Sequence, residues 1–228
     1  MRLSIIVPAL NEATNIASTL LPLQAWRARD VEIIVADGGS TDATRDLAQP
    51  LADNVIDSAP GRARQMNAGA AAASGEALLF LHADSHLPPD ADQAVMSALS
   101  VSPWGRFDVS ITGAQPMLRV VAWFMNHRSR LSGIATGDQG LFMRRETFER
   151  IGGFPDQPLM EDVEICRRLK KISPPACLAP RITTSGRRWE KHGVWRTIVL
   201  MWWLHLRYFL DTSPADIHRA YYGRPNVR

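Results

Sequence analysis

The sequence predicts an α/β fold in which helices cover both faces of a mostly parallel central sheet. Short apolar runs alternate with segments of helical apolar spacing along residues 1–103, which is the order expected of strand–helix–strand units. The runs are continuously apolar instead of alternating, and this favours parallel strands buried on both faces. Polar clusters follow several runs directly, and such sheets bind ligands at the carboxyl ends of their strands.

Each expected element follows from its own local pattern. Short apolar runs predict strands, and apolar residues spaced three and four apart predict helices. The expected strands are Leu3–Val7, Val31–Ala36, Val55–Ile56, Ala77–Leu81, Phe107–Thr112 and Gly140–Met143. The expected helices are Ala13–Trp26, Ala43–Ala52, Ala63–Ala73, Met117–Leu131, Arg145–Ile151 and Glu161–Lys171. One side of the helix over Met117–Leu131 is apolar and comprises Val120, Val121, Phe124 and Leu131.

Composition and charge narrow the class of protein. With 228 residues, of which 46% are hydrophobic, the chain suits one domain. Residues 1–103 hold 6 Lys and Arg against 12 Asp and Glu, whereas residues 104–228 hold 20 against 11. A basic half suits an anionic membrane surface or a phosphate-bearing substrate. No nucleic acid is expected, because the arginines are scattered and no binding motif appears.

Two features bear on location. Only Cys166 and Cys177 are present, in no zinc-binding spacing, which favours a reduced, cytoplasmic setting. The first ten residues predict a strand and no signal peptide. The apolar run Thr197–Leu206, bounded by Arg196 and Arg207, would rise about 15 Å as a helix, roughly half of a hydrocarbon core. It predicts either a core helix or a helix lying at a membrane surface.

Two polar clusters suit a nucleoside. Pro8–Glu12 follows the first strand, where the carboxylate of Glu12 could accept hydrogen bonds from a ribose or a base. Alternatively, Asn11 and Glu12 only cap the next helix. After the second strand, Gly38 would let the backbone approach a ligand, and Asp37 is placed to pair with a donor on a base edge. A purely structural turn is the alternative there.

Two further clusters suit phosphates and a cation. Arg62 and Arg64 flank a predicted helix start, where backbone N–H groups also favour an anion; ordinary solvated arginines are the alternative. His82 and Asp84 lie two residues apart at a strand end, so both can face one side and share a divalent cation. A structural histidine is the alternative for His82.

Carboxylates near residue 160 suit acid–base chemistry. Glu161 and Asp162 begin a predicted helix, and a carboxylate at a cleft edge can act as a general base. Acidic residues in a first helical turn are also expected from the helix dipole alone. Asp138 and Gln139, between two glycines, could shape an acceptor loop or only form a turn.

Taken together and in this order, the clusters resemble the inverting family-2 glycosyltransferases of the GT-A fold. The resemblance runs from Ser4 to about Arg168 and is far more specific in combination than in any single cluster. The segments that carry it are Ser4–Glu12, Ala36–Asp42, Phe80–Asp84 and Glu161–Asp162. Gly61–Asn67 and Gly137–Gly140 are similar to a small bacterial subgroup of that family.

The resemblance implies a role for individual residues. Glu12 and Asp37 would bind the nucleoside, with Asp37 on the base, while Asp84 would hold Mg²⁺ or Mn²⁺ on the diphosphate. Asp162 would deprotonate the acceptor hydroxyl. His82 stands where the family's Asp-x-Asp motif has its first aspartate, and imidazole suits Mn²⁺ better than Mg²⁺. The other residues assigned to substrate binding are Pro8, Asn11, Gly38, Arg62, Asn67, Asp138, Gln139 and Glu161.

The implied reaction moves a sugar from a nucleoside-diphosphate sugar, typically a UDP-sugar, to a hydroxyl acceptor. A peripheral position at the inner face of the plasma membrane would suit a lipid-linked acceptor. Within one domain over residues 1–228, the nucleotide-binding half would be 1–103, the acceptor and catalytic half 104–190, and a helical segment 191–228.

Two alternatives stay open. A non-catalytic nucleotide-sugar-binding module could keep the fold, and His82 favours this reading because the motif is altered there. A sugar nucleotidyltransferase would carry a glycine-rich, basic loop after the first strand. The chain has Pro8–Glu12 at that point, without glycine or lysine, which argues against the second alternative.

Overall fold

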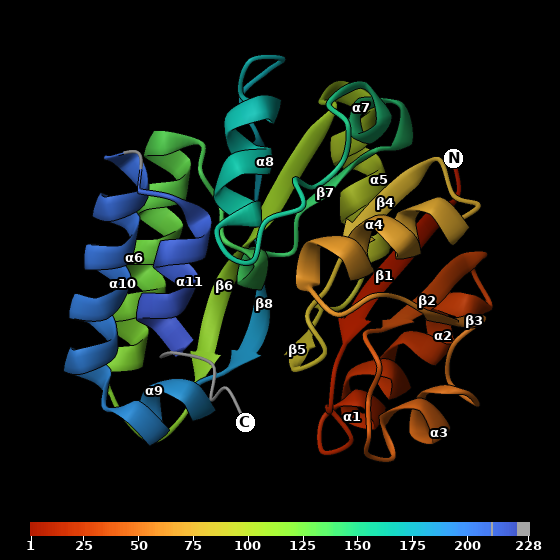
Figure 1. Cartoon of the computed structure of the whole chain (residues 1–228). Helices are drawn as coiled ribbons and strands as arrows, with labels where there is room; N and C mark the ends of the chain where they lie inside the picture. The colour runs from red at the N-terminus through yellow and green to blue at the C-terminus, as the bar shows by residue number, and fades with distance from the viewer. Residues whose placement is uncertain (211, 223–228) are drawn as a thin grey trace.

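The strands of the protein form one mixed sheet. The computed structural model describes residues 1–210 and 212–222, and within them an eight-stranded sheet has the order β3-β2-β1-β4-β7-β6-β8-β5 (Figure 1). The strands are β1 (Leu3–Ala9), β2 (Val31–Asp37), β3 (Asn54–Asp57), β4 (Ala77–Phe80), β5 (Ser85–His86), β6 (Trp104–Thr112), β7 (Phe142–Arg144) and β8 (Ala176–Ser185). The helices are α1 (Ile16–Leu20), α2 (Gln24–Arg27), α3 (Thr44–Ala48), α4 (Arg62–Ala72), α5 (Ala91–Val101), α6 (Met117–Ser132), α7 (Arg145–Arg150), α8 (Glu161–Leu169), α9 (Arg187–His192), α10 (Val194–Phe209) and α11 (Pro214–Tyr222).

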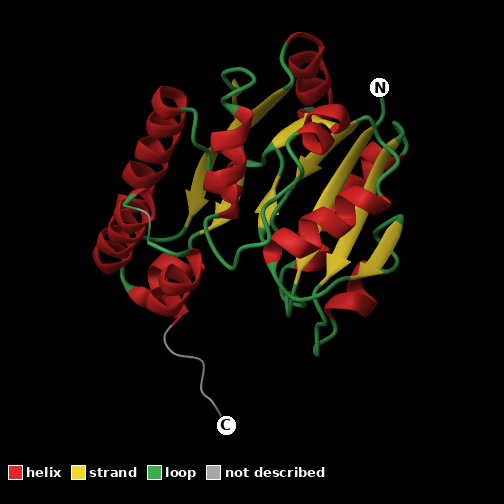
Figure 2. Ribbon diagram, turned by 45° about the horizontal axis from the view of Figure 1, so that its top comes forward, coloured by secondary structure: helices red, strands yellow, loops and turns green. Residues whose placement is uncertain are grey.

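Helices cover both faces of the sheet, as predicted (Figure 2). Every residue of β1, β2 and β4 is buried. Because successive side chains of a strand point to opposite faces, Ile5 and Val7 belong to one core cluster with residues of α1 and α5. Ile6 belongs to a second cluster with residues of α4 and α8. Continuous apolar runs therefore correspond here to strands buried on both sides.

Strand direction is where the structure adds to the prediction. The pairs β1–β2, β1–β4, β2–β3 and β6–β8 are parallel. In contrast, β7 runs antiparallel to both β4 and β6, and β5 runs antiparallel to β8. A strand as short as β7 carries no local signal for its direction, which is set by the path of the connections on either side.

Several helices differ from their expected bounds. The segment expected as one helix over Ala13–Trp26 is α1, a 3₁₀ turn over Leu21–Leu23, and α2. Pro22 lies in that turn and has no backbone N–H to continue an α-helix. No local pattern predicted α5, β5, β8 or α9, whereas α10 and α11 lie within the segment 191–228 that was expected to be helical, and the apolar run Thr197–Leu206 lies inside α10. Within the described residues, no helix combines the length and apolar character needed to cross a membrane.

Three of the four residues on the predicted apolar side of α6 face outward, contrary to the usual arrangement of an amphipathic helix, and only Val121 is buried. Val120, Phe124 and Leu131 are 45%, 52% and 90% exposed. On the opposite side of α6, Asn126 and Ser129 are buried. The buried side of α6 is therefore mixed, with Leu118, Val121 and Ala122 beside Asn126 and Ser129, while several large apolar side chains face away from the core.

The buried polar side of α6 serves strand β6. The side chain of Asn126 accepts the Val109 N–H at 2.8 Å and donates to the Val109 carbonyl at 3.0 Å, as a neighbouring strand would. Arg106, which is fully buried, donates to the Asn126 carbonyl and pairs with Asp108. Buried polar groups need such partners, so β6 requires polar side chains on the helix that covers it.

Candidate active site

The polar clusters meet in one cleft at the carboxyl ends of β1 and β4. Its volume is about 950 Å³, within the range of ligand-binding pockets. Eight of the thirteen residues predicted for the site line it, namely Pro8, Glu12, Arg62, His82, Asp84, Asp138, Glu161 and Asp162. Five others, Asn11, Asp37, Gly38, Asn67 and Gln139, do not line it.

Asp162 is held in place by backbone donors. It lies in the first turn of α8, where its Oδ1 accepts the Val163 N–H at 2.8 Å and its Oδ2 accepts the Gly137 N–H at 2.9 Å. Both oxygens can still accept another hydrogen bond, because each carboxylate oxygen has two lone pairs. The contact with Gly137 ties the start of α8 to the loop that carries Asp138, so two predicted clusters form one unit.

Glu161 lies beside Asp162 but is almost completely buried. Its Oε1 is 3.5 Å from Nη1 of Arg62. Burial raises the pKa of Glu161 above its usual value and the neighbouring charge of Asp162 adds to this, while Arg62 opposes it. The two adjacent carboxylates therefore sit in different environments, and Asp162 is the one with backbone donors on both oxygens.

His82 is engaged with the loop opposite it. Its Nδ1 lies 3.1 Å from Oδ1 of Asp138. Its Nε2 is buried and has no hydrogen-bond partner among the described residues. A Cβ at position 137 would overlap the imidazole ring, so only glycine fits there. The structure thus gives His82 a carboxylate partner and packs its other ring nitrogen against Gly137.

Asp84 is the half-buried carboxylate of the cleft that follows β4. Among the described residues, no group of three or more His, Cys, Asp or Glu side chains could hold a metal ion. A divalent cation bound through one or two carboxylates plus substrate phosphates does not require such a group. Asp84, as a single carboxylate of the cleft, could therefore be one ligand of such a cation.

The residues of the cluster Pro8–Glu12 divide between the cleft and the loop behind it. Glu12 lines the cleft, accepts a hydrogen bond from Asn15 at 2.6 Å, and lies 3.8 Å from Nη2 of Arg187. Asn11 has a positive φ of 54° and accepts the Thr41 N–H at 2.8 Å through its side chain. Asn11 therefore joins the two loops that follow β1 and β2.

Asp37 and Gly38 shape the loop after β2 in ways that do not involve the cleft directly. Asp37 is buried, and its Oδ2 accepts the N–H groups of Gly39 at 3.1 Å and Ser40 at 3.0 Å. A Cβ at Gly38 would lie 2.9 Å from the side chain of Gln65, which donates to backbone carbonyls of β1 and β2. The local geometry is that of a structural turn with a tightly packed glycine.

Asn67 and Gln139 also bind backbone or side chains behind the cleft. Asn67 donates to the Phe154 carbonyl at 2.8 Å and accepts the Phe154 N–H at 2.9 Å. Gln139 is fully buried, completes a capping box with Thr136, and donates to the Ser129 hydroxyl at 3.0 Å. Both side chains therefore fix loops that border the cleft.

Arg64 and Arg62 flank the start of α4 but have different surroundings. Arg64 pairs with Asp156 at 2.8 Å on the surface, whereas Arg62 lines the cleft. Of the two arginines, only Arg62 is placed to meet a phosphate in the cleft.

The far wall of the cleft was not predicted by any motif. It is formed by β8 and the helices after it, and includes Thr184, Ser185, Arg187, Trp189, Lys191, Thr197, Met201, His205, His218 and Tyr221. Two sequence signals bear on this wall: the excess of basic residues after position 104, and the apolar run Thr197–Leu206, which contains Thr197, Met201 and His205. Arg187 and Lys191 bring part of that excess to the cleft.

Behind this wall, a buried arginine meets a histidine. Arg128 donates to Nε2 of His205 at 3.3 Å, and Nδ1 of His205 lies 2.7 Å from the Met201 carbonyl, so Nδ1 carries the proton. Burial lowers the pKa of His205, and the charge of Arg128 lowers it further. His205 is therefore neutral at physiological pH.

Comparison with known proteins assigns the fold and the family. Over 96% of its length, the chain superimposes with a TM-score of 0.67 on 68% of the mannosyltransferase PcManGT of Pyrobaculum calidifontis, in complex with GDP-Man and Mn²⁺, at 22% identity. Over 82% of its length it matches 61% of S. aureus TarS (residues 1–349), with a TM-score of 0.64 and 16% identity. The chain therefore has the GT-A glycosyltransferase fold.

The family model for glycosyl transferase family 2 matches residues 4–152, and the chain belongs to this family. It is 30% identical over 172 residues to a PGL/p-HBAD biosynthesis glycosyltransferase of Mycobacterium tuberculosis, which covers 72% of this chain and 56% of the relative. It is 31% identical over 109 residues to an uncharacterised glycosyltransferase of Nostoc sp., covering 45% of this chain and 34% of the relative. The chain thus spans about half or less of the length of these curated relatives.

Proposed function

We propose that the protein transfers a sugar from a nucleoside-diphosphate sugar, first of all a UDP-sugar, to a hydroxyl acceptor with inversion at the anomeric carbon. The observation that carries the proposal is Asp162, a carboxylate held by two backbone N–H groups in a cleft that also contains Asp84 and Glu12. Solved structures of similar fold contain UDP-GlcNAc, in TarS, or GDP-Man with Mn²⁺, in PcManGT, which supports this class of donor.

Each cleft residue has a task in this reaction. Glu12 and Arg62 both line the cleft; in this reaction Glu12 would bind the nucleoside and Arg62 would supply positive charge to the diphosphate. Asp162 takes the proton of the acceptor hydroxyl as that oxygen attacks the anomeric carbon. Attack on the face opposite the leaving diphosphate inverts the configuration. Asp37 supports binding of the nucleotide base indirectly, because it fixes the loop after β2.

A divalent cation, Mn²⁺ or Mg²⁺, would be held by Asp84 together with diphosphate oxygens. Bound there, it would neutralise the charge that grows on the departing nucleoside diphosphate. His82 orients Asp138 from the neighbouring loop, since its Nδ1 already has that carboxylate as a partner.

A thermal-shift screen of nucleoside diphosphates and their sugars tests the proposal. A ligand that binds only the folded protein raises its melting temperature. We expect a shift with one nucleotide that grows with Mn²⁺ or Mg²⁺ and disappears with chelator. If UDP, GDP and dTDP all fail to bind at millimolar concentration in calorimetry with Mn²⁺ present, the proposal is wrong.

A non-catalytic binding module of the same fold is the second candidate. The observation that favours it is His82, which occupies the first position of the family's metal motif and is paired with Asp138. Such a module would bind a nucleotide sugar and release no nucleoside diphosphate. Turnover of the donor under conditions of saturating binding therefore separates the two candidates.

We further propose that the protein lies on an anionic membrane surface at the cytoplasmic side through α6 and α10. The two helices pack against each other through Leu118, Val121 and Val194, and they lie side by side in Figure 1. The large apolar residues that they expose are Val120, Trp123, Phe124, Leu131, Trp195, Val199, Trp202, Trp203, Leu206 and Phe209. Aromatic side chains of this kind are enriched at membrane interfaces.

The charges on these helices favour a membrane over a second copy of the chain. Neither α6 nor α10 contains an acidic residue, while five arginines lie on them. Anionic lipids attract such a surface, whereas a self-complementary dimer would place arginines near arginines.

Vesicle flotation tests the membrane proposal. Replacing Trp202 with Ala should weaken binding to anionic vesicles by roughly ten- to a hundredfold, because a large apolar side chain contributes roughly 1.5–3 kcal/mol when buried. Leu21→Ala, at an exposed apolar site on the 3₁₀ turn near α1, is the control and should bind normally. Absence of the wild-type protein from anionic vesicles at low salt would refute the proposal.

A further inference from the structure

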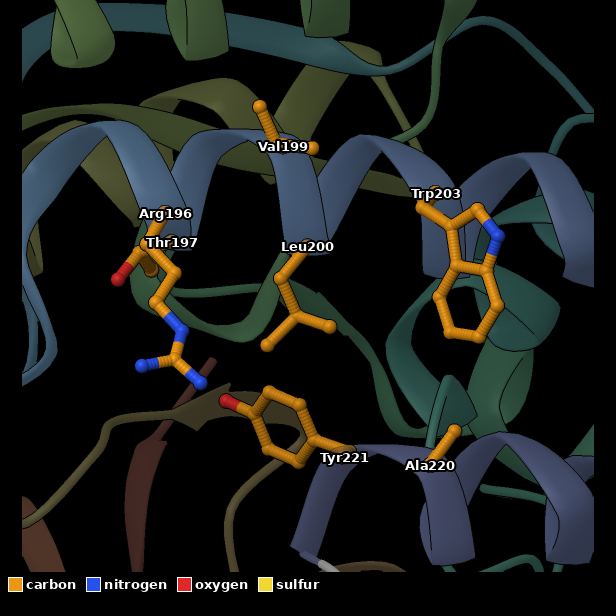
Figure 3. Close-up of a pocket in the computed structure, with 7 residues that line it drawn as sticks. All are labelled: Arg196, Thr197, Val199, Leu200, Trp203, Ala220 and Tyr221. Atoms are coloured by element: carbon orange, nitrogen blue, oxygen red, sulfur yellow. The ribbon is translucent and has the colours of Figure 1, made fainter.

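Helices α10 and α11 enclose a second cavity, which we call the tail groove. Its volume is about 560 Å³, and it is lined by Arg196, Thr197, Val199, Leu200, Trp203, Ala220 and Tyr221. Figure 3 shows Leu200 and Trp203 on α10 facing Tyr221 and Ala220 on α11, with the guanidinium of Arg196 at the end nearer Tyr221. The groove is thus mainly apolar along its length and basic at one end.

The tail groove adjoins the candidate active site. Thr197 and Tyr221 line both the groove and the cleft that contains Asp162. On α10, residues 197, 201 and 205 recur every four positions and face the cleft. Residues 196, 200 and 203 form the neighbouring row and face the groove. Because rows at such spacing lie side by side on a helix, α10 forms the partition between the two cavities.

The groove has the chemistry of a site for an apolar chain. None of its lining residues is acidic, and its volume lies within the range of about 300–1,000 Å³ found for small-molecule sites. The indole of Trp203 and the side chain of Leu200 offer apolar surface, while Arg196 suits a polar or anionic group at the end of a chain. A purely polar acceptor would leave this surface unused.

We propose that the tail groove holds the apolar chain of an amphipathic acceptor whose hydroxyl group reaches Asp162. The inference rests on the proposed function and adds to it the class of acceptor. The acceptor oxygen bonds to the anomeric carbon, its proton passes to Asp162, and the bond from that carbon to the diphosphate oxygen breaks. The bonding electrons leave with the nucleoside diphosphate, so the step needs no further reactant.

Chain-length dependence of binding is the first test. The probes are n-hexyl and n-octyl β-glucoside, used below the concentration at which they form micelles, in calorimetric titrations with the wild-type protein. Each methylene buried should strengthen binding about fourfold, so the octyl compound should bind roughly fifteenfold more tightly than the hexyl compound. Equal affinities for the two compounds would overturn the proposal.

Adjacent tryptophans provide a matched pair of variants. Trp203 lines the groove, whereas its neighbour Trp202 is more exposed, at 69% against 44%, and does not line it. Trp203→Ala should lose most of the increase in affinity between the hexyl and octyl compounds, and Trp202→Ala should keep that increase. Equal losses in the two variants would show adsorption to the outer face of α10 and would overturn the proposal.

Ala220→Phe tests the groove by filling it. Ala220 is exposed on α11 and lines the groove, so the change leaves the core intact and should also remove the gain from the longer chain. Retained chain-length dependence in this variant would contradict the assignment. A dimer that dissociates on Trp203→Ala would assign the groove to a second copy of the chain instead.

Titration of the same samples with nucleoside diphosphate and Mn²⁺ separates this inference from the proposed function. Nucleotide binding without any dependence on alkyl-chain length would refute the proposed role of the tail groove and leave the proposed transferase activity standing. Dependence on alkyl-chain length without nucleotide binding would refute the proposed transferase activity, and the apolar chain in the tail groove could then not belong to an acceptor.

Discussion

Replacing Asp162 with Asn removes the charge of the proposed base and alters two hydrogen bonds. Oδ1 and Oδ2 of Asp162 accept N–H groups of Val163 and Gly137 at 2.8 and 2.9 Å. An asparagine has one acceptor oxygen, so its amide would face one of these two N–H groups with another donor. A buried donor left unpaired costs about 1–3 kcal/mol, which bounds the expected loss of stability.

The expected loss of turnover is larger than the loss of stability. General base catalysis contributes about 10²–10⁴ in rate, which corresponds to roughly 3–5 kcal/mol of activation free energy. Turnover of Asp162→Asn should therefore fall at least a hundredfold, while nucleotide binding stays within a few-fold because the donor side of the cleft is unchanged. The assay is release of nucleoside diphosphate from the donor found by thermal shift.

Glu164→Gln is the matched control. Glu164 lies in the same first turn of α8 and also carries a charge favoured by the helix dipole, but it does not line the cleft. Its partners are Arg167, Arg168 and the Tyr208 hydroxyl. This variant should keep its turnover. If folded Asp162→Asn retained turnover within about threefold of Glu164→Gln, Asp162 would not be the general base.

Three further predictions follow from the same geometry. Asp84→Asn should abolish the metal-dependent part of the nucleotide thermal shift, whereas Asp46→Asn on the exposed side of α3 should not; an unchanged shift would place the cation elsewhere. The stability of Glu161→Gln relative to the wild type, measured by urea unfolding, should be greater at pH 8 than at pH 5. Burial raises the pKa of Glu161 above its usual value of 4.5, so the folded protein binds this proton more tightly than the unfolded chain does. The stability of the wild type therefore falls as the pH rises above that usual value, and parallel pH profiles for the two proteins would contradict this cause. Gly69→Ala should destabilise the protein by about 1–3 kcal/mol despite the higher helix propensity of alanine, because its Cβ would overlap the side chain of Ile6. A higher denaturation midpoint for this variant would show that α4 can move away from β1.

The first half of the chain was the more predictable from sequence. Strands β1, β2 and β4 are each a continuous buried run followed at once by polar residues. In a parallel sheet, residues that follow consecutive strands must meet at one edge. Local patterns were therefore sufficient to bring Glu12, Arg62 and Asp84 to one cleft. They could not show that Asp37 bonds the backbone of its own loop or that Asn67 bonds the backbone of Phe154, because the local sequence does not specify a side chain's partner.

The far wall of the cleft was less predictable for the same physical reason. β8 pairs with β6, more than seventy positions earlier in the chain, and its short apolar run Ala176–Ala179 is half-buried or exposed and is followed by Pro180, which is unfavourable within a sheet. Gln139 illustrates the difficulty at a single residue. Between two glycines it suggested an acceptor loop, yet its side chain is fully buried against Ser129 on α6. Nothing in the local sequence distinguishes a glutamine that binds substrate from one that caps a turn.

Helix α10 shows why an apolar run need not be a core helix. It is apolar around most of its circumference, which for a helix of a globular protein indicates burial on all sides. One row, with Leu204 and Tyr208, does pack in the core, while Thr197 and His205 face the cleft. Trp202 and Leu206 remain exposed on the outer row, beside α6, which also turns apolar residues outward. Burial within the chain accounts for only part of this apolar surface. The remainder is explained if the outer row, with Trp202 and Leu206, contacts lipid. The row that faces the tail groove, with Leu200 and Trp203, would then contact the apolar chain of an acceptor taken from the same lipid surface.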